Sequence, residues 1–416
     1  MQPIKVGFIG GGFIGAFQVQ AMSQIRNMEL AGVYSPNSAP KLAQYAKEMG
    51  VGDAVVYPTI AELVKNVEVV AVYCANFARV EVFEQIAEAV KAGAELKGLI
   101  IEKPLARNLP EAKRMVELTK EIGVPTSYFE NQLHMKPIKA QMAQLEPQRS
   151  GMGPMVLSRC AEEHAGPHNA WFWDPTQQGG GVLSDMGCHS IAVGWYVLNP
   201  IGKPLNFMQP VSVSCEVGLL KWGQPLWRER LKERFGVDYE KMPAEDFTTG
   251  MITYRNPENG QLAKSQFTNS WMFEKQGLRI LMDGMGPGYA FELNTLQSPL
   301  NIFIGDEAAE AAADAETALE KSTTSRGLMP VHHNEADLYG YTDENHEAAE
   351  AFSEGRPGMM SIDYGYEIVK LCMAAYLSAE TGKVVDLTDE ATLKQLDRYI
   401  PAIQKGEGAD QLYGRK

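Results

Sequence analysis

The sequence predicts two domains, and three observations carry this prediction. Residues 1–130 alternate short apolar runs with amphipathic stretches, which is typical of a Rossmann doubly wound parallel α/β sheet. A glycine-rich turn follows the first apolar run, as in dinucleotide-binding domains. Residues 131–416 have longer strands that follow one another, which predicts an α+β domain on a large, mainly antiparallel open sheet. A length of 416 residues fits two or more cores of ordinary size.

The elements of the N-terminal domain follow from hydrophobic periodicity. Strands are expected at Ile4–Ile9, Glu29–Tyr34, Val69–Tyr73, Leu99–Ile101 and Thr126–Phe129. Amphipathic helices are expected at Ser38–Met49, Val80–Ala92 and Pro110–Ile122.

The elements of the C-terminal domain begin with a strand at Met155–Ala161 and a helix at Val182–Leu198. Further strands are expected at Val211–Leu220, Phe247–Tyr254, Gln261–Ser270, Leu278–Asp283 and Gly288–Leu293, and closing helices at Asn345–Glu354 and Tyr364–Glu380. Insertions are expected near 222–244, where a helical excursion fits the mixed charged and aromatic residues, and near 306–340, which begins with the Ala/Glu-rich stretch Asp306–Lys321.

Composition and charge narrow the class of partner. With 38 Lys and Arg against 52 Asp and Glu, the net charge of -14 argues against nucleic-acid binding and leaves small molecules as the easier ligands. No apolar run approaches the roughly 18 residues of a membrane span, and the N-terminus lacks the layout of a signal peptide. Five cysteines without CxxC pairing indicate reduced thiols in a cytoplasmic protein.

The glycine-rich turn has the spacing of a phosphate cradle, GxGxxG, between a strand and a helix. Gly10 permits a tight turn, Gly12 lets the backbone approach a pyrophosphate, and Gly15 lets the helix pack close to the strand. The pyrophosphate then lies at the helix N-terminus. The expected cofactor-binding residues here are Gly10, Gly12, Phe13, Ile14 and Gly15.

The choice between NAD and NADP stays open. An NAD site usually has Asp or Glu about 20 residues after the glycines, to hold the ribose hydroxyls. This chain has Ser35 and Asn37 there, which together with Lys41 suit a 2′-phosphate, yet no arginine accompanies them. The expected cofactor is therefore NAD or NADP.

Two further motifs carry chemistry. Glu102-Lys103-Pro104 follows an expected strand, at the sheet edge where ligands bind in such folds. Asp185 and His189 are spaced i, i+4 at the start of an expected helix, which places both side chains on one face. A carboxylate beside an imidazole orients it and stabilises its charged form, as proton transfer requires.

With these motifs in place, the sequence resembles the Gfo/Idh/MocA family, named for glucose–fructose oxidoreductase and inositol dehydrogenase. The matching marks are GxGxxG, Glu-Lys-Pro, Gly-Gly-x-x-x-Asp-x-x-x-His, the pair Glu245-Asp246 before a strand, and the C-terminal run His346–Glu380. The resemblance covers nearly the whole chain. It implies a homo-oligomer, a dimer or tetramer.

The resemblance also implies roles for individual residues. Lys103, Asp185 and His189 form the catalytic group, Glu102 and Lys103 line the cofactor, and Asn76 meets the nicotinamide ribose. The base is His189, held by Asp185, or else Lys103. One departure lies where the family often has Asn-x-x-His, because this chain has Asn76-Phe77-Ala78-Arg79.

A loop rich in His, Trp and carboxylates precedes the catalytic helix and is expected to border the substrate. Its candidate residues are Glu163, His164, His168, Trp171 and Trp173, together with the catalytic group. The tryptophans suit stacking on a sugar or aryl face, or equally a hydrophobic plug that anchors the loop. No metal is expected, because Pro167 interrupts the His164–His168 spacing and no companion ligands are evident.

The function that these features favour is NAD(P)-dependent hydride transfer at a secondary hydroxyl carbon of a sugar, glycoside or cyclitol. One alternative is a redox-neutral glycosidase or epimerase that oxidises the sugar transiently. Another is a non-catalytic protein that senses NAD(P).

Overall fold

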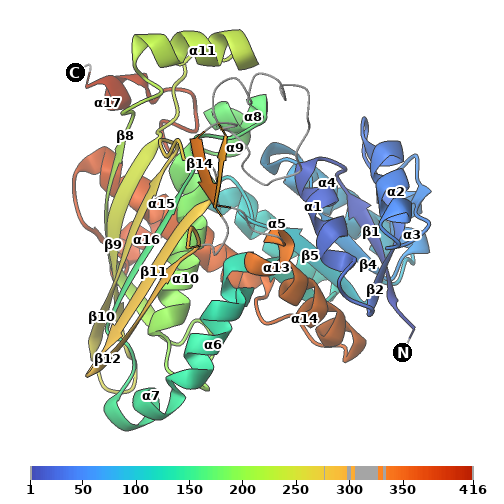
Figure 1. Ribbon diagram of the computed structural model, residues 1–416, viewed down its shortest axis with the longest axis horizontal. Coiled ribbons are helices and arrows are strands. Elements are labelled where there is room, and N and C mark those ends of the chain that lie inside the picture. Colours follow the sequence, from blue (N-terminus) through green and yellow to red (C-terminus); the bar gives the residue numbers. More distant parts are fainter. Residues whose placement is uncertain (1, 276, 298–300, 305–326, 331–333, 415–416) are drawn as a thin grey trace. The chain divides into compact units, whose positions relative to one another are not determined.

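The computed structural model describes residues 2–275, 277–297, 301–304, 327–330 and 334–414. The chain divides into two compact units (Figure 1). Unit 1 comprises residues 1–138 and 336–370, and unit 2 comprises residues 139–335 and 371–416. The division into domains at residue 130 stays a prediction.

Unit 1 contains a six-stranded sheet whose paired strands are all parallel, in the order β3-β2-β1-β4-β5-β6. The strands are β1 (Ile4–Ile9), β2 (Met28–Tyr34), β3 (Val55–Val56), β4 (Val69–Val72), β5 (Gly98–Glu102) and β6 (Thr126–Phe129). This order reverses beside β1, as in a doubly wound Rossmann sheet, so the predicted fold class is confirmed. Strand β3 was not predicted, because two exposed valines carry no periodicity.

The helices of unit 1 alternate with these strands. They are α1 (Phe13–Met22), α2 (Ala39–Glu48), α3 (Ile60–Asn66), η1 (Asn76–Ala78), α4 (Arg79–Lys91), α5 (Leu109–Ile122) and η2 (Asn131–His134). Local signals set the ends of α5: the Asn108 side chain accepts the N–H of Glu111 at 3.0 Å, and Gly123 ends the helix with φ +66°.

A late segment of the chain completes the core of unit 1. Helix α14 (Tyr341–Ser353) contributes Ala348, Ala349 and Phe352 to the cluster that contains Ile4 and Ile100. A side chain at Gly98 of β5 would meet the Phe352 ring at 2.5 Å, so the glycine admits the ring against the strand.

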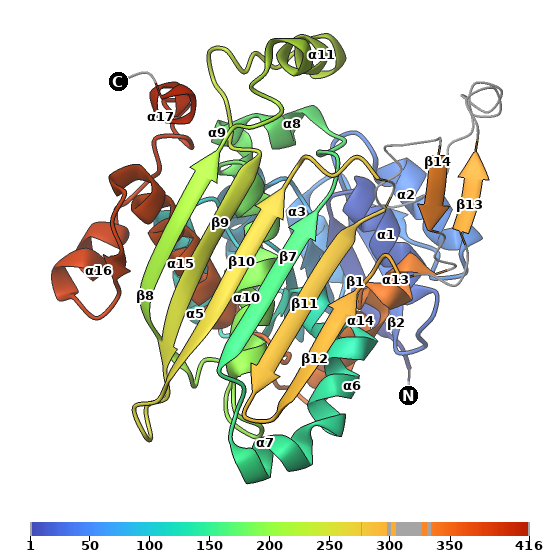
Figure 2. The same cartoon turned by 60° about the vertical axis from the view of Figure 1, so that its left-hand side comes forward.

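Unit 2 contains a seven-stranded sheet in the order β12-β11-β7-β10-β9-β8-β15. The strands are β7 (Leu157–Glu163), β8 (Gln209–Gly218), β9 (Phe247–Arg255), β10 (Leu262–Ser270), β11 (Arg279–Gly286), β12 (Tyr289–Asn294) and β15 (Val385–Asp386). Figure 2 shows strands β8 to β12 side by side, with β7 between β10 and β11. Only the β7–β10 pair is parallel, so the sheet is mainly antiparallel as predicted.

Helix α10 (Cys188–Leu198) packs against the centre of this sheet. Its Gly194 lies so close to β10 that a Cβ would be 2.1 Å from the Ser265 hydroxyl, and the Ser158 hydroxyl of β7 donates to the Gly194 carbonyl at 3.0 Å. In β10 alternate residues such as Ala263 and Phe267 are buried, which leaves the other set toward solvent.

Further helices and short strands belong to unit 2 or have residues in both units. They are α7 (Glu146–Met152), α8 (Ala170–Trp173), α9 (Pro175–Gln178), η3 (Leu183–Gly187), α11 (Pro225–Phe235), β13 (Asn301–Ile304), β14 (Gly327–Pro330), α16 (Glu390–Leu396) and α17 (Ala409–Tyr413) in unit 2, and α6 (Lys136–Gln144), α13 (Glu335–Leu338) and α15 (Ile362–Thr381), which have residues in both units. Helix α11 confirms the helical excursion expected within 222–244, whereas the stretch Asp306–Lys321 lies outside the described residues. None of the described helices is long and apolar enough to cross a membrane.

The packing of Phe352 against β5 predicts that α14 stabilises unit 1. Replacing Phe352, which is 2% exposed, by alanine should lower the free energy of unfolding by about 3–5 kcal/mol, because it leaves a cavity in the core. Phe77→Ala is the control, since that ring is 47% exposed, and its effect should stay within about 0.5 kcal/mol. Urea unfolding followed by circular dichroism measures both, and equal shifts for the two variants would contradict the prediction.

Candidate active site

The glycine-rich turn of unit 1 connects β1 to α1. Gly10 has φ +113°, and a Cβ there would lie 2.6 Å from the carbonyl of Tyr73, so both its conformation and its surroundings require glycine. A Cβ on Gly15 would lie 3.0 Å from the Gly10 carbonyl, which shows how closely α1 approaches the turn. Gly12, by contrast, faces open space and caps the first turn of α1.

The loop after β2 carries the residues expected to select the nucleotide. Ser35 is half-buried, and its hydroxyl lies 2.9 Å from that of Ser38, while Asn37 is exposed. Ser35 directly follows β2 at the carboxyl edge of the sheet, where ligands bind in doubly wound folds.

The Glu-Lys-Pro motif lies at the same edge of the sheet. Glu102 ends β5 and is 5% exposed, Lys103 is half-buried, and the Lys103-Pro104 peptide is cis. Asn76, at the start of η1 after β4, is 2% exposed.

Arg79 holds this edge together, a role that the sequence did not suggest. Its guanidinium donates to the carbonyls of Glu102 at 2.5 Å and Lys103 at 3.2 Å, and also to that of Pro104. Arg79 is the residue at which the sequence departs from the Asn-x-x-His pattern of the resemblance, and its side chain binds the backbone of the Glu-Lys-Pro segment.

In unit 2 the carboxylate of Asp185 is buried among polar partners. Its Oδ2 accepts a hydrogen bond from Trp271 Nε1 at 3.3 Å and lies 3.8 Å from His164 Nε2. His164 Nδ1 accepts the Gly166 N–H at 2.9 Å, so the ring proton resides on Nε2, the nitrogen that faces Asp185. Sequence reasoning placed His164 among substrate residues and did not find Trp271.

Asp185 and His189 lie in one continuous helical stretch. Asp185 belongs to η3, a single π-helical turn, and His189 to the first turn of α10, which follows it directly. Both are buried, at 5% and 3% exposure. The predicted helix over Val182–Leu198 therefore exists, but it begins with a π turn, a feature that is frequent at functional sites.

Glu245 fixes the start of this helical stretch. Its carboxylate accepts the N–H of Gly181 at 2.9 Å and of Leu183 at 3.1 Å, and the hydroxyl of Tyr376 donates to it at 2.6 Å. Burial raises the pKa of Glu245 to about 7, against the lowering effect of the Tyr376 and backbone hydrogen bonds. A Cβ on Gly181 would lie 2.1 Å from the Glu245 carbonyl, so the glycine makes the contact possible.

Asp246 fixes a different loop. Its carboxylate accepts the N–H groups of Leu220, Lys221 and Trp222 at 2.7 to 2.8 Å. Burial raises the pKa of Asp246, and these backbone hydrogen bonds oppose that effect. The residue therefore braces the 220–222 backbone.

In the loop expected to contact substrate, Glu163 and Trp173 are bound to other side chains of the protein. Glu163 forms an ion pair with Arg279 at 2.6 Å, and Trp173 is 1% exposed in a cluster with Trp222 and Trp271. The packing of Trp173 matches the hydrophobic plug.

Two aromatic side chains of the same loop, His168 and Trp171, are half-buried and lie beside a third ring. His168 and Trp171 each contact Phe172, with ring centroids 6.2 and 3.8 Å away. Among the described residues no group of three or more His, Cys, Asp or Glu is placed to hold a metal ion.

Comparison with protein families identifies the chain. Residues 4–129 match the model of the Gfo/Idh/MocA oxidoreductase family with an NAD-binding Rossmann fold, and residues 157–387 match the model of its C-terminal α/β domain. The chain belongs to the Gfo/Idh/MocA oxidoreductase family. The resemblance seen in the motifs is thereby confirmed.

Two relatives are named as enzymes of sugar derivatives, and one similar solved structure contains NAD. A 1,5-anhydro-D-fructose reductase from Ensifer adhaerens is 29% identical over 220 residues, which cover 52% of this chain and only 62% of the relative. A D-glucoside 3-dehydrogenase from Escherichia coli K12 is 26% identical over 397 residues, 92% of this chain and 98% of the relative. The solved structure of GenD2 from gentamicin A biosynthesis in complex with NAD matches with a TM-score of 0.70 and 20% identity, covering 93% of this chain and 97% of that one.

The residues of unit 1 fit the nicotinamide dinucleotide of this family. Gly12 leaves space against the backbone at the N-terminus of α1, where the first N–H groups of a helix lack intrahelical partners and the helix dipole favours a phosphate. NAD(P) is therefore the cofactor of this oxidoreductase family member.

The raised pKa of Glu245 predicts a pH-dependent stability. Because the folded-state pKa of about 7 exceeds the ordinary value of 4.5, the folded protein retains a proton that the unfolded chain loses between these values, so stability falls as pH rises through that window. The loss is about 3–4 kcal/mol, at about 1.4 kcal/mol per pKa unit. Glu245→Gln should remove this contribution and flatten the profile.

Urea unfolding of the wild type and Glu245→Gln from pH 4.5 to 8 measures this contribution. The exposed Glu240→Gln serves as the control and should follow the wild-type profile. Parallel profiles for Glu245→Gln and the wild type would contradict the prediction.

Proposed function

We propose that this protein transfers a hydride between NAD(P) and a secondary hydroxyl carbon of a sugar, glycoside or cyclitol. The observation that carries the proposal is the buried carboxylate of Asp185, which lies in the same helical stretch as His189. This carboxylate accepts a hydrogen bond from Trp271 and faces His164. Ionisable groups buried together in this way are costly for folding and concentrate at functional sites. The relatives named as a D-glucoside dehydrogenase and an anhydrofructose reductase support the substrate class.

The proposed catalytic group is Lys103, Asp185 and His189. His189 takes the hydroxyl proton as the carbon–hydrogen bond is broken, and Asp185 stabilises the imidazolium that forms. Lys103 donates a hydrogen bond to the same oxygen and stabilises its developing negative charge. Bound NAD(P) supplies the hydride acceptor at its nicotinamide ring.

Further residues are proposed to bind the cofactor and the substrate. On the cofactor side these are Gly10, Gly12, Phe13, Ile14, Gly15, Ser35, Asn37, Asn76, Glu102 and Lys103, and on the substrate side Glu163, His164, His168 and Trp171. Arg79 positions Lys103 through the backbone carbonyls that it binds. A homo-oligomeric assembly is part of the same proposal.

The first test combines a cofactor assay with catalytic variants. Denatured protein is examined for released nucleotide, and reduction of NAD and NADP is followed over a panel of sugars, glycosides and cyclitols. Lys103→Met and His189→Asn should each lower kcat by about 10²–10⁴-fold, the usual contribution of a proton-transfer group, while both variants still bind the cofactor. Lys113→Met and His346→Asn, at exposed positions, are the matched controls.

The outcomes separate the alternatives. Sugar consumed with retained cofactor and no net reduction would replace the proposal by a redox-neutral glycosidase or epimerase. Full biological output from Lys103→Met and His189→Asn would indicate a non-catalytic NAD(P) sensor instead.

The loop after β2 generates a prediction about the nucleotide. Ser35→Asp places a carboxylate where an NADP 2′-phosphate would lie, so kcat/KM with NADP should fall about tenfold or more while that with NAD changes little. Ser23→Asp, an exposed serine just after α1, controls for the added charge. An unchanged ratio of NADP to NAD activity in Ser35→Asp would show that this loop does not contact the ribose phosphate.

A further inference from the structure

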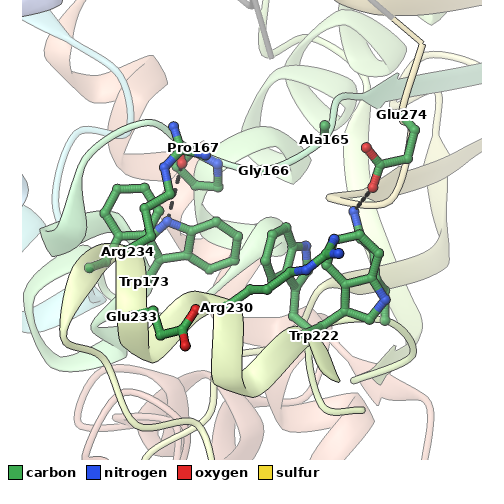
Figure 3. Close-up of a pocket in the computed structure, with 12 residues that line it drawn as sticks. Ala165, Gly166, Pro167, Trp173, Trp222, Arg230, Glu233, Arg234 and Glu274 are labelled. Atoms are coloured by element: carbon green, nitrogen blue, oxygen red, sulfur yellow. Dashed lines mark hydrogen bonds and ion pairs between the residues drawn. The ribbon is translucent and has the colours of Figure 1, made fainter. Parts of the chain in front are cut away.

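A cavity of about 490 Å³ in unit 2 has no role in the proposed hydride transfer. It lies between α11 and the loop 165–167, and Figure 3 shows Arg230, Glu233 and Arg234 of α11 along one side with Trp222 and Glu274 beside them. Its volume is in the range of small-molecule pockets. Aromatic rings and cations together form most of its wall.

Each cation of this wall is held over an aromatic ring. Trp227 has Lys221 Nζ at 4.1 Å and the Arg230 guanidinium at 4.8 Å from its ring centre. The Arg234 guanidinium lies 4.8 Å from the centre of Phe235. Arg230 and Arg234 are exposed, and these cation–π contacts favour positions of their charges beside the cavity.

The charges of the wall are not balanced. Lys221 is buried and forms an ion pair with Glu274. Arg230 and Arg234 lie four residues apart on α11, a spacing at which like charges repel. Within the part of the chain that the structure describes, neither guanidinium has a carboxylate oxygen within 4.0 Å, although Glu233 also borders the cavity.

The backbone behind the cavity is fixed from the interior. Asp246 holds the N–H groups of Lys221 and Trp222, and Trp222 Nε1 donates to the Trp271 carbonyl at 2.8 Å. Trp271 in turn donates to Asp185, and His164, which faces Asp185, directly precedes Ala165 in the cavity wall. The cavity wall therefore begins at the residue that follows His164, the side chain that faces Asp185.

We propose that this cavity binds the anionic group, a phosphate or a carboxylate, of a sugar substrate. The inference rests on the proposed function for its assignment to substrate. Arg230 and Arg234 supply planar guanidiniums that match two oxygens of either anion. The charge of Lys221 is balanced by Glu274. The substrate class is thereby narrowed to sugars that carry an acidic substituent.

Calorimetric titration of the full-length protein, with NAD(P) present, tests the site without requiring turnover. The probes are glucose 6-phosphate, glucuronate and neutral glucose. The wild type should bind at least one of the two anionic sugars about tenfold or more tightly than glucose, and the tighter of the two identifies the anion. This preference should weaken as salt is raised.

Variants assign the preference to the cavity. Arg230→Gln with Arg234→Gln should remove it, whereas Lys232→Gln with Lys241→Gln, which changes the net charge equally at exposed positions, should leave it intact. Arg230→Lys with Arg234→Lys keeps the charge without the planar donors and should retain part of it. Thermal unfolding of each variant verifies the fold.

Three results would contradict the proposed site. They are no binding of either anionic sugar, an affinity for the anionic sugars equal to that for glucose, or an unchanged preference in the Arg230→Gln, Arg234→Gln protein. Failure of the proposed function is distinguishable, because the anion preference would persist in calorimetry while no sugar supported reduction of NAD(P). In that case the cavity stands as a binding site for anionic sugars.

Discussion

Two adjacent buried carboxylates, Glu245 and Asp246, hold the part of unit 2 on which the proposed chemistry depends. Glu245 binds the N–H groups at the start of the helical stretch that contains Asp185 and His189. Asp246 binds the 220–222 backbone that forms one wall of the cation-lined cavity. Two consecutive residues just before β9 therefore fix both the start of the helical stretch and the wall of the cavity.

Placing these carboxylates in the interior is costly unless their oxygens are hydrogen-bonded. Here the donors are mostly backbone N–H groups, which must come close to the carboxylate. At Gly181 that approach leaves no room for a side chain, since a Cβ would lie 2.1 Å from a backbone oxygen. Close packing therefore explains why the motif has glycine at position 181. This glycine serves the geometry of the site without touching the reacting groups.

The sequence predicted those parts of the protein that local physics decides. The parallel strands of unit 1 follow from apolar runs, and the turn at Gly10 follows from spacing alone, because each depends on residues near one another in the chain. The contact between Trp271 and Asp185 joins residues 86 positions apart, and no local pattern announces it. Arg79 was read only as a departure from the family motif, because its role depends on the three carbonyls of Glu102, Lys103 and Pro104, which the fold brings to its guanidinium.

Trp173 shows why composition alone does not separate a binding residue from a core residue. Its indole suits stacking on a sugar, yet the structure buries it between Trp222 and Trp271, with ring centres 4.5 and 5.0 Å away. Trp271 binds Asp185, and Trp222 forms the cavity wall, so this aromatic layer sets the separation between the two. Closely packed interiors resist such displacement. A substrate whose anion occupies the cavity would consequently be selected by the distance between that anion and the hydroxyl that reacts, as well as by the charge itself.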